Sequence, residues 1–353
     1  MGVSSLKILI AGAGAVGLAL ALRLAKAGHR VTVADPAASG DNASGVAAGM
    51  LAPAFEALFD EAAERFDLLC EARDLWPELA GDIGLTLMRE GALGVGSAEK
   101  VRDWTGRLAA MGAEPVVLGA AEAAERAPGL AEGLHGVQTA ADWRLEPDAA
   151  LAALRRAAVA AGAEFHSVRV LGFAEGVAQL GGGARLEADV LVIATGAEQG
   201  LADLAPELGA LSPIKGHILR APGLVRSGPT VRGAGVYVCA SQGGALIGAT
   251  MESGRDDTAI DAAVVADLLR RVEEIIPNLS AATVTAAAGV RGATADGWPL
   301  VGPRRTPDVF LAVGARRNGW LLAPMMARVL EQRLSGAPAD ALSRLFDPAR
   351  PGL

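Results

Sequence analysis

The chain has 353 residues, of which 51% are hydrophobic, and a formal net charge of -8. The length is sufficient for two domains with a sizeable core, and the negative charge argues against nucleic acid as a general partner. No uncharged stretch approaches the roughly 18 to 20 apolar residues of a membrane span, and the short N-terminal apolar run is too short for a cleavable signal, so we expect a soluble, cytoplasmic protein.

The first predicted unit is a strand, a tight turn and a helix. The apolar run Lys7–Ala11 leads into a glycine pattern that opens a helix rich in alanine and leucine. Gly12 permits the turn, Gly14 lets the backbone approach a pyrophosphate, and Gly17 allows the helix to pack closely on the strand. This order of elements predicts a dinucleotide site, with a tight turn in an unrelated α/β protein as the alternative.

A second strand, 30–34, ends at Asp35, where a carboxylate can meet the hydroxyls of an adenosine ribose. The loop 36–49 that follows is crowded with small residues, which let backbone amides approach a flat or anionic ligand; a flexible surface loop is the alternative. Apolar and acidic residues at helical spacing then predict one amphipathic helix over 55–76.

The next segments alternate between helices and strands. A strand is predicted at 86–95, helices at 98–111 and 147–161, a strand at 164–170, and a buried parallel strand at 188–196. Beyond Pro213 the period changes, and 216–220, 236–239 and 245–249 read as antiparallel strands. The chain closes with helices at 264–276 and 320–334, with a strand at 309–313 between them, and Pro324 is placed in the first turn of the last helix.

These elements predict an α/β fold in which a Rossmann-like nucleotide-binding domain receives an inserted α+β domain with an antiparallel sheet. The first domain is discontinuous and comprises 1–82, 146–213 and 290–353, and the second comprises 83–145 and 214–289. No metal site and no disulfide are expected, because the cysteines and histidines lie far apart with no ligand spacing: Cys70, Cys239, His29, His135, His166 and His217.

Several motifs together resemble the D-amino-acid oxidase superfamily of FAD enzymes, and within it the glycine oxidases of thiamine biosynthesis. The similarity spans nearly the whole chain. It rests on the glycine pattern with Asp35, on the Ala-Gly-Met-Leu-Ala-Pro sequence within 44–53, on the Val-Ile-Ala-Thr-Gly strand, and on Lys215-Gly216, 248–252, 288–291, 296–299, 317–319 and Ala323-Pro324.

The resemblance implies a Rossmann-like domain of the D-amino-acid-oxidase type with non-covalently bound FAD. Carried over residue by residue, it adds to the three glycines the FAD-binding residues Ala15, Val16, Asp35, Ala43, Ser44, Ala48, Gly49, Met50, Val170, Arg317, Asn318, Gly319, Trp320 and Leu321. It also implies that Arg291 and Arg317 bind the substrate carboxylate, for which a planar guanidinium is suited, and that Tyr237 lies in the active site. Structural ion pairs and a core aromatic are the respective alternatives.

The chain departs from the family pattern at two places. Ala315 and Arg316 stand where the family usually has histidine and an aromatic residue, and Ala240-Ser241 follows the tyrosine strand in place of Pro-Arg. These changes concern the substrate pocket rather than the cofactor.

The resulting expectation is an FAD-dependent oxidase that removes a hydride from the Cα of a small amino acid or amine, yields an imine, and reduces oxygen to hydrogen peroxide. Alternatives are a dehydrogenase of D-amino acids or secondary amines with a quinone acceptor, and a flavin-binding protein without amine oxidation. An NAD-dependent dehydrogenase is disfavoured because the C-terminal motif would have no role. The expected partner is the small-molecule substrate, and a homo-oligomer stays open.

Overall fold

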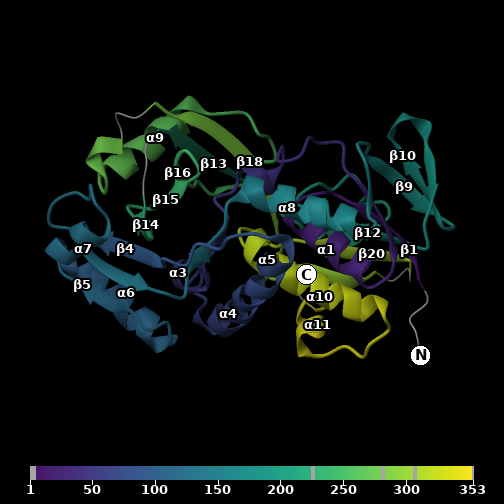
Figure 1. Ribbon diagram of the computed structural model, residues 1–353, viewed down its shortest axis with the longest axis horizontal. Coiled ribbons are helices and arrows are strands. Elements are labelled where there is room, and N and C mark those ends of the chain that lie inside the picture. Colours follow the sequence, from purple (N-terminus) through teal and green to yellow (C-terminus); the bar gives the residue numbers. More distant parts are fainter. Residues whose placement is uncertain (1–4, 224–226, 280–282, 305–307, 352–353) are drawn as a thin grey trace.

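The computed structural model describes residues 5–223, 227–279, 283–304 and 308–351 (Figure 1). Within this part of the chain, six strands form a sheet in the order β19-β20-β12-β1-β2-β8, in which all neighbours except β19 and β20 run parallel. The strands are β1 (Lys7–Ala11), β2 (Arg30–Ala34), β8 (Glu164–His166), β12 (Val190–Ile193), β19 (Leu300–Pro303) and β20 (Val309–Val313).

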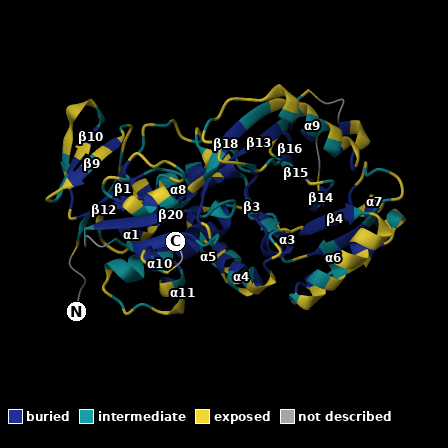
Figure 2. Cartoon of the chain, turned by 180° about the vertical axis from the view of Figure 1, so that it is seen from behind, coloured by how far each residue is buried: buried dark blue, intermediate teal, exposed yellow. Residues whose placement is uncertain are grey.

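Both faces of this sheet are covered, which explains its nearly continuous apolar strands. On one face Ile8 and Ile10 pack with the helices α1 (Ala15–Lys26), α8 (Pro147–Ala160) and α10 (Gly319–Leu334). On the other face Leu9 and Leu191 pack with a small antiparallel sheet of β9 (Val170–Ala174), β10 (Val177–Leu180) and β11 (Arg185–Glu187). In Figure 2 the central strands of this six-stranded sheet, β1, β12 and β20, are accordingly mostly dark blue.

The second large sheet contains nine of the described strands and is antiparallel except where β14 meets β4. Its strands are β4 (Ala92–Gly96), β5 (Val116–Leu118), β6 (His135–Thr139), β13 (Ser212–Pro222), β14 (Thr230–Gly233), β15 (Val236–Ser241), β16 (Gly244–Gly248), β17 (Glu252–Ser253) and β18 (Thr285–Ala293). The helices α7 (Ala120–Arg126) and α9 (Ala262–Glu273) pack on one face of this sheet, the face that carries Leu93 and Val95 of β4. The helix α6 (Ala98–Ala110) packs on the opposite face, with Ala92 of β4. The predicted fold class, a Rossmann-like sheet combined with an antiparallel one, is confirmed.

The single helix predicted over 55–76 is wrong. The segment folds instead into α3 (Pro53–Phe59), a short 3-10 turn (Ala63–Arg65), α4 (Phe66–Asp74) and the start of α5 (Trp76–Ile83). Glu61 adopts a left-handed φ of 53°, which an α-helix cannot continue. Pro77 lies in the first turn of α5, where its missing N–H is not needed.

Two other predicted strands also differ from the structure. In the segment 86–95, Met88 makes only an isolated bridge, and the strand begins at Ala92. The segment 164–170 divides between β8 and β9, which belong to different sheets. The division into two domains stays a prediction; β18 extends across its boundary at residue 290.

The remaining described elements join these layers. They are α2 (Ala43–Val46), the short pair β3 (Met50–Leu51) and β7 (Trp143–Arg144), and α11 (Ala341–Leu345) near the C-terminus. None of the helices in the described segments has the length and apolar character required to cross a membrane.

Candidate functional site

A cavity of about 1170 Å³ opens at the carboxyl ends of the parallel strands. Gly12 follows β1, Asp35 follows β2 and Thr195 follows β12, and all three line it. The opposite wall is formed by residues of β18, including Gly289 and Arg291. The carboxyl edge of a parallel sheet is where open α/β folds bind their ligands.

The glycine turn at one end of the cavity has no room for side chains. Gly12 has a φ of 109°, and a Cβ there would lie 2.4 Å from the carbonyl oxygen of Ala194; a Cβ on Gly17 would lie 2.0 Å from the carbonyl oxygen of Gly12. Gly14 is the N-cap of α1. The cavity therefore reaches the N-terminal end of α1, where the helix dipole favours an anion.

Asp35 and Ser44 brace this turn. The Asp35 carboxylate accepts hydrogen bonds from the backbone N–H groups of Ala13 at 2.6 Å and Ala37 at 2.8 Å, and the Ser44 hydroxyl accepts one from Ala15 at 3.0 Å. Farther along, the Trp320 indole N–H donates to the Ser44 carbonyl at 3.0 Å. The turn after β1 and the start of α10 are thus both connected to the small-residue loop.

Most of the predicted FAD-binding and catalytic residues line this one cavity, although they come from five regions of the sequence. These are Gly12, Gly14, Ala15, Val16, Asp35, Ala43, Ser44, Val170, Arg291, Arg317, Gly319 and Trp320. The remaining predicted residues do not line this cavity: Gly17, Ala48, Gly49, Met50, Tyr237, Asn318 and Leu321.

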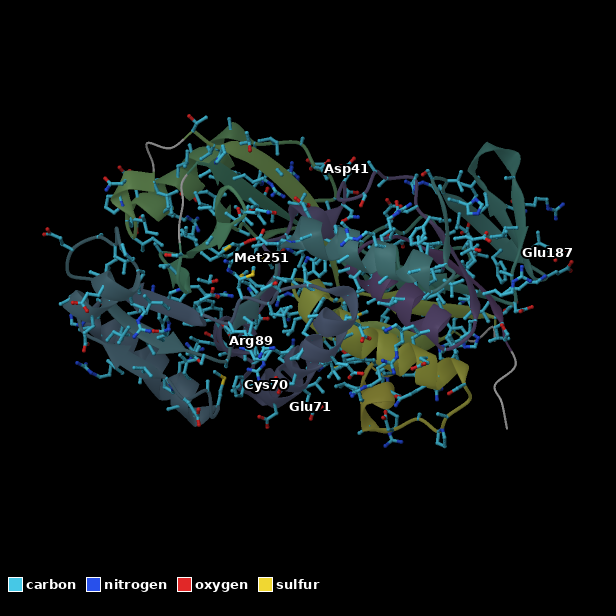
Figure 3. All side chains as sticks on the ribbon, viewed as in Figure 1. Asp41, Cys70, Glu71, Arg89, Glu187 and Met251 are labelled. Atoms are coloured by element: carbon cyan, nitrogen blue, oxygen red, sulfur yellow. The ribbon has the colours of Figure 1, made fainter. Side chains whose placement is uncertain are left out.

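Arg291 reaches the cavity from β18 without a counter-ion. Its Nη1 lies 3.3 Å from the Thr250 carbonyl oxygen and 3.6 Å from the Met251 sulfur, and within the described ranges no carboxylate forms an ion pair with it. Figure 3 shows Met251 in the middle of the molecule. Burial lowers the pKa of Arg291, because removing the guanidinium from water disfavours its charged form. Such a group is well placed to bind an anionic ligand.

Arg317, in contrast, is already paired. Its guanidinium contacts the carboxylate of Glu56 and, at 2.9 Å, that of Asp60. Asp60 also binds Arg316 at 2.6 Å, and Glu56 binds Arg232 at 3.2 Å. The Arg316 side chain therefore points to Asp60.

Sequence reasoning missed Glu56 and Asp60. They stand four residues apart on the side of α3 that meets these arginines, and Glu56 is 5% exposed. An acidic pair at helical spacing within a short, otherwise mostly apolar segment was the available signal.

Tyr237 lies on β15 in a small apolar cluster with Ala48. Burial raises the pKa of its hydroxyl, and the charge of Arg291 opposes that rise. Tyr237 therefore stays a neutral hydroxyl near neutral pH.

Two strand glycines make room for these side chains. A Cβ on Gly248 would lie 2.3 Å from the Tyr237 hydroxyl, and one on Gly216 would lie 2.2 Å from Nη1 of Arg291. In the described part of the chain, no group of three or more His, Cys, Asp or Glu side chains could hold a metal ion.

Comparison with known proteins places these features in context. Residues 7–333 match the model of the DAO family of FAD-dependent oxidoreductases. The chain is 32% identical to the glycine oxidase of Geobacillus kaustophilus over 350 residues, 90% of each protein, and 28% identical to that of Bacillus licheniformis, covering 94% of this chain and 93% of the relative.

Solved structures give the same picture. The crystal structure of the Geobacillus kaustophilus glycine oxidase superimposes with a TM-score of 0.86 at 28% identity, covering 98% of this chain and 99% of the other. The iminodiacetate oxidase of Chelativorans sp. BNC1 superimposes with a TM-score of 0.80 at 26% identity, covering 98% and 100%.

Proposed function

The chain belongs to the DAO family of FAD-dependent oxidoreductases, and from that premise we propose that it oxidises the Cα–N bond of a small amino acid or amine in the manner of a glycine oxidase. The products are an imine and, with oxygen as electron acceptor, hydrogen peroxide. The observation that carries the proposal is the half-buried guanidinium of Arg291, which lines the cavity with no carboxylate partner in the described residues.

The cofactor, FAD, fits the residues that are present. The cavity is large, its glycine turn packs against neighbouring backbone too closely for side chains, and the N-terminal end of α1 opens into it beside Asp35. None of the described residues that line the cavity is a cysteine or a histidine, which agrees with the expected non-covalent binding. When bound, FAD accepts the two electrons and the hydrogen that leave the substrate Cα.

The protein's own residues bind and orient the substrate in this proposal. Arg291 holds the substrate carboxylate by charge-assisted hydrogen bonds. Tyr237 belongs to the same site by its motif position, and its hydroxyl interacts electrostatically with Arg291. Glu56 and Asp60 fix Arg317 at the cavity wall and neutralise its charge, so Arg291 supplies most of the attraction for an anion. Orienting the Cα–H bond and excluding water is the main task of the protein when a cofactor supplies the chemistry.

The finer parts of the proposal follow the relatives. A role in thiamine biosynthesis is supported by 31% identity over 349 residues to a Rhizobium etli protein whose name assigns it provisionally to that process. We also propose a small substrate, because the motif positions of Tyr237, Met50 and Trp320 put them around the substrate Cα, and Trp320 lines the cavity. The cytoplasm stays the expected compartment.

Anaerobic mixing with a panel of amines tests the proposal through bleaching of the flavin band, which requires no assumption about the acceptor. Glycine, sarcosine or D-alanine should reduce the flavin faster than D-phenylalanine, because extra methylenes in a packed site cost about 1 to 3 kcal/mol. Faster reduction by D-phenylalanine would refute the small pocket. No bleaching by any amine would indicate a flavoprotein of another function, and reduction without reoxidation by oxygen would indicate a dehydrogenase.

A further inference from the structure

The segment 255–261, which we call the strap, connects β17 to α9 and contributes to the wall of the cavity. Three of its side chains, those of Asp256, Thr258 and Ile260, line the same cavity as the glycine turn and Ser44. Neither the sequence motifs nor the family resemblance assigns these residues to the cofactor.

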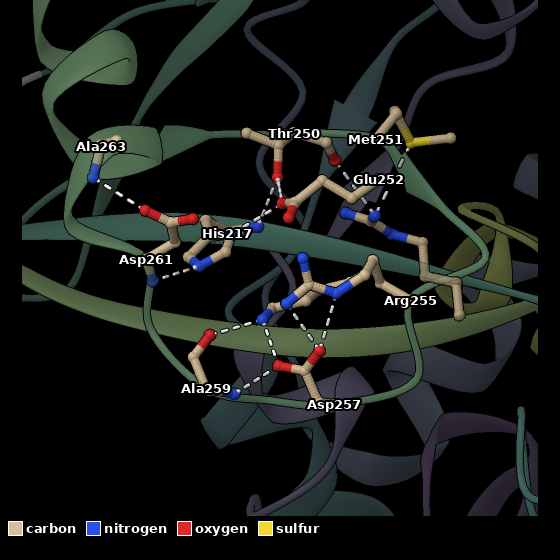
Figure 4. Close-up of polar contacts among 11 residues, drawn as sticks. His217, Thr250, Met251, Glu252, Arg255, Asp257, Ala259, Asp261 and Ala263 are labelled. Carbon is tan, nitrogen blue, oxygen red and sulfur yellow. Dashed lines mark hydrogen bonds and ion pairs between the residues drawn. The ribbon is translucent and has the colours of Figure 1, made fainter.

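Successive residues of the strap face two different surroundings. Its even-numbered residues line the cavity, whereas its odd-numbered residues make polar contacts with β13 or with each other (Figure 4). The Asp257 carboxylate pairs with Lys215 at 2.5 Å and with Arg255 at 2.8 Å. In an extended chain, successive side chains point to opposite sides. The contacts of the odd-numbered residues with β13 therefore fix the direction in which the even-numbered side chains point, which is into the cavity.

The anchors of the strap are fully buried. Lys215 and His217 are each 0% exposed and stand two residues apart on β13. Lys215 donates to the Ala259 carbonyl at 2.5 Å as well as to Asp257. His217 accepts the Asp261 N–H at Nε2, at 3.1 Å, and its Nδ1 contacts Glu252 at 2.8 Å.

These anchors hold the middle and the C-terminal end of the strap. Glu252 belongs to β17, which pairs with β13, and Asp261 caps the N-terminus of α9 through the Ala263 N–H at 2.9 Å. A buried lysine is costly unless it is paired and hydrogen-bonded, and the strap supplies a carboxylate and a carbonyl to the Lys215 ammonium. The strap is therefore a built feature of the cavity wall rather than a loose connection.

We infer that the strap is part of the FAD site, with Asp256, Thr258 and Ile260 facing the dinucleotide and with Lys215 and His217 holding them there. The chemistry of the three side chains suits this ligand. Ile260, 47% exposed, offers an apolar surface to a ring or a sugar. The Thr258 hydroxyl can donate to a phosphate, and the Asp256 carboxylate, which can only accept, suits the hydroxyls of a ribose or ribityl chain.

FAD affinity of the stripped protein tests the inference without an activity assay. Ile260→Ser removes apolar contact with the ligand but touches neither anchor, and should raise the FAD Kd roughly fivefold. Val159→Ser is the matched control, because Val159 is also a β-branched apolar residue and is similarly exposed, at 53%, but lies on α8 outside the cavity. This variant should change the FAD Kd less than twofold. Equal Kd values for the two variants would overturn the inference.

Lys215→Met tests the anchor, and should raise the FAD Kd at least as much as Ile260→Ser. Lys215 is buried, so its replacement can prevent folding and make the FAD Kd of that variant unmeasurable. Hydrogen exchange of backbone amides in the unmodified protein provides a measurement that does not depend on the variant. Binding of FAD should slow exchange of the Thr258 and Ile260 amides at least tenfold relative to the stripped protein. Unchanged exchange at both amides would refute contact between strap and cofactor even if Lys215→Met fails to fold.

Discussion

At the scale of single residues, the two predicted carboxylate-binding arginines differ in what surrounds them. Arg317 is held between Glu56 and Asp60, whereas Arg291 faces the cavity with a carbonyl and a thioether beside it. A buried cation gains most from an incoming anion when no carboxylate already neutralises it. Arg291 is therefore the residue on which substrate recognition should depend most strongly.

We predict that Arg291→Met lowers kcat/KM for the best amino acid of the panel at least thirtyfold, because losing one partner of a desolvated charge pair costs about 2 to 5 kcal/mol. The loss should be much smaller for an analogous amine that lacks the carboxylate. Stopped-flow reduction of the flavin measures both rates.

Arg304→Met is the matched control for that change. Arg304 pairs with Glu207 at 3.4 Å outside the cavity, so this variant should leave both rates within about twofold of the original. Equal losses for the acid and for the amine without carboxylate in Arg291→Met would contradict carboxylate binding by Arg291.

At the scale of elements, α10 contains Pro324 at a position where a proline removes a helical hydrogen bond. From the sequence we placed it in the first turn, where no hydrogen bond is lost. The helix begins at Gly319, so Pro324 lies beyond the first turn, and the expected first-turn position is wrong. A proline there leaves the carbonyl four residues earlier without its helical donor. That carbonyl, of Trp320, accepts the indole N–H of Trp76 at 3.0 Å instead.

We predict that Trp76→Phe destabilises the protein by about 1 to 3 kcal/mol, because it leaves a buried carbonyl without a donor. Urea unfolding followed by circular dichroism measures the change. Trp143→Phe is the control, since it removes an indole hydrogen bond of similar length, 3.1 Å to Ala140, at an exposed site.

The same site allows a rescue experiment. Pro324→Ala supplies a backbone N–H to the Trp320 carbonyl, so the double variant Trp76→Phe/Pro324→Ala should recover part of the lost stability. If Trp76→Phe is equally destabilising with and without Pro324→Ala, the loss comes from packing of the indole ring and not from the carbonyl.

At the scale of the whole molecule, a buried carboxylate joins the antiparallel sheet to the helices beside the cavity. Asp142 lies between β6 and β7, is 2% exposed, and accepts the N–H groups of Ala54 at 2.7 Å and Phe55 at 3.2 Å at the start of α3. Burial raises its pKa to about 6, against the opposing effects of Arg232 and the two amides.

This raised pKa predicts how stability changes with pH. Between about pH 4 and 6 the folded protein keeps a proton on Asp142 that the unfolded chain has released, so this group makes stability fall as the pH rises. A difference of about two pKa units corresponds to about 2 to 3 kcal/mol, fully expressed above pH 6. Below pH 4 both states are protonated and the effect is absent.

Asp142→Asn isolates this contribution because other carboxylates titrate in the same range. The difference in unfolding free energy between the variant and the original protein, measured by urea titration from pH 4 to pH 7, should shift by that amount in favour of the variant. A difference that is constant over this range would show that Asp142 does not titrate as described.

The sequence alone determined the features that depend on neighbours in the chain. Gly12, Gly14, Gly17 and Asp35 were recognisable because a strand, a tight turn and a helix are set by local sterics and a short repeat. The change from a continuous apolar strand to short strands with alternating apolar and polar residues likewise predicted the second, antiparallel sheet. The single helix over 55–76 was wrong because periodicity does not reveal the left-handed residue Glu61.

Only the tertiary structure decided which side chains meet. Glu56 and Arg317 are 261 positions apart, so no local pattern could show that an acid on α3 would occupy one predicted arginine and leave Arg291 without a counter-ion. The strap beside the cavity and the donor from Trp76 to the Trp320 carbonyl depend in the same way on contacts across the fold. Local backbone preferences act over a few residues, whereas burial and charge pairing act through space, and these decide the chemistry of the site.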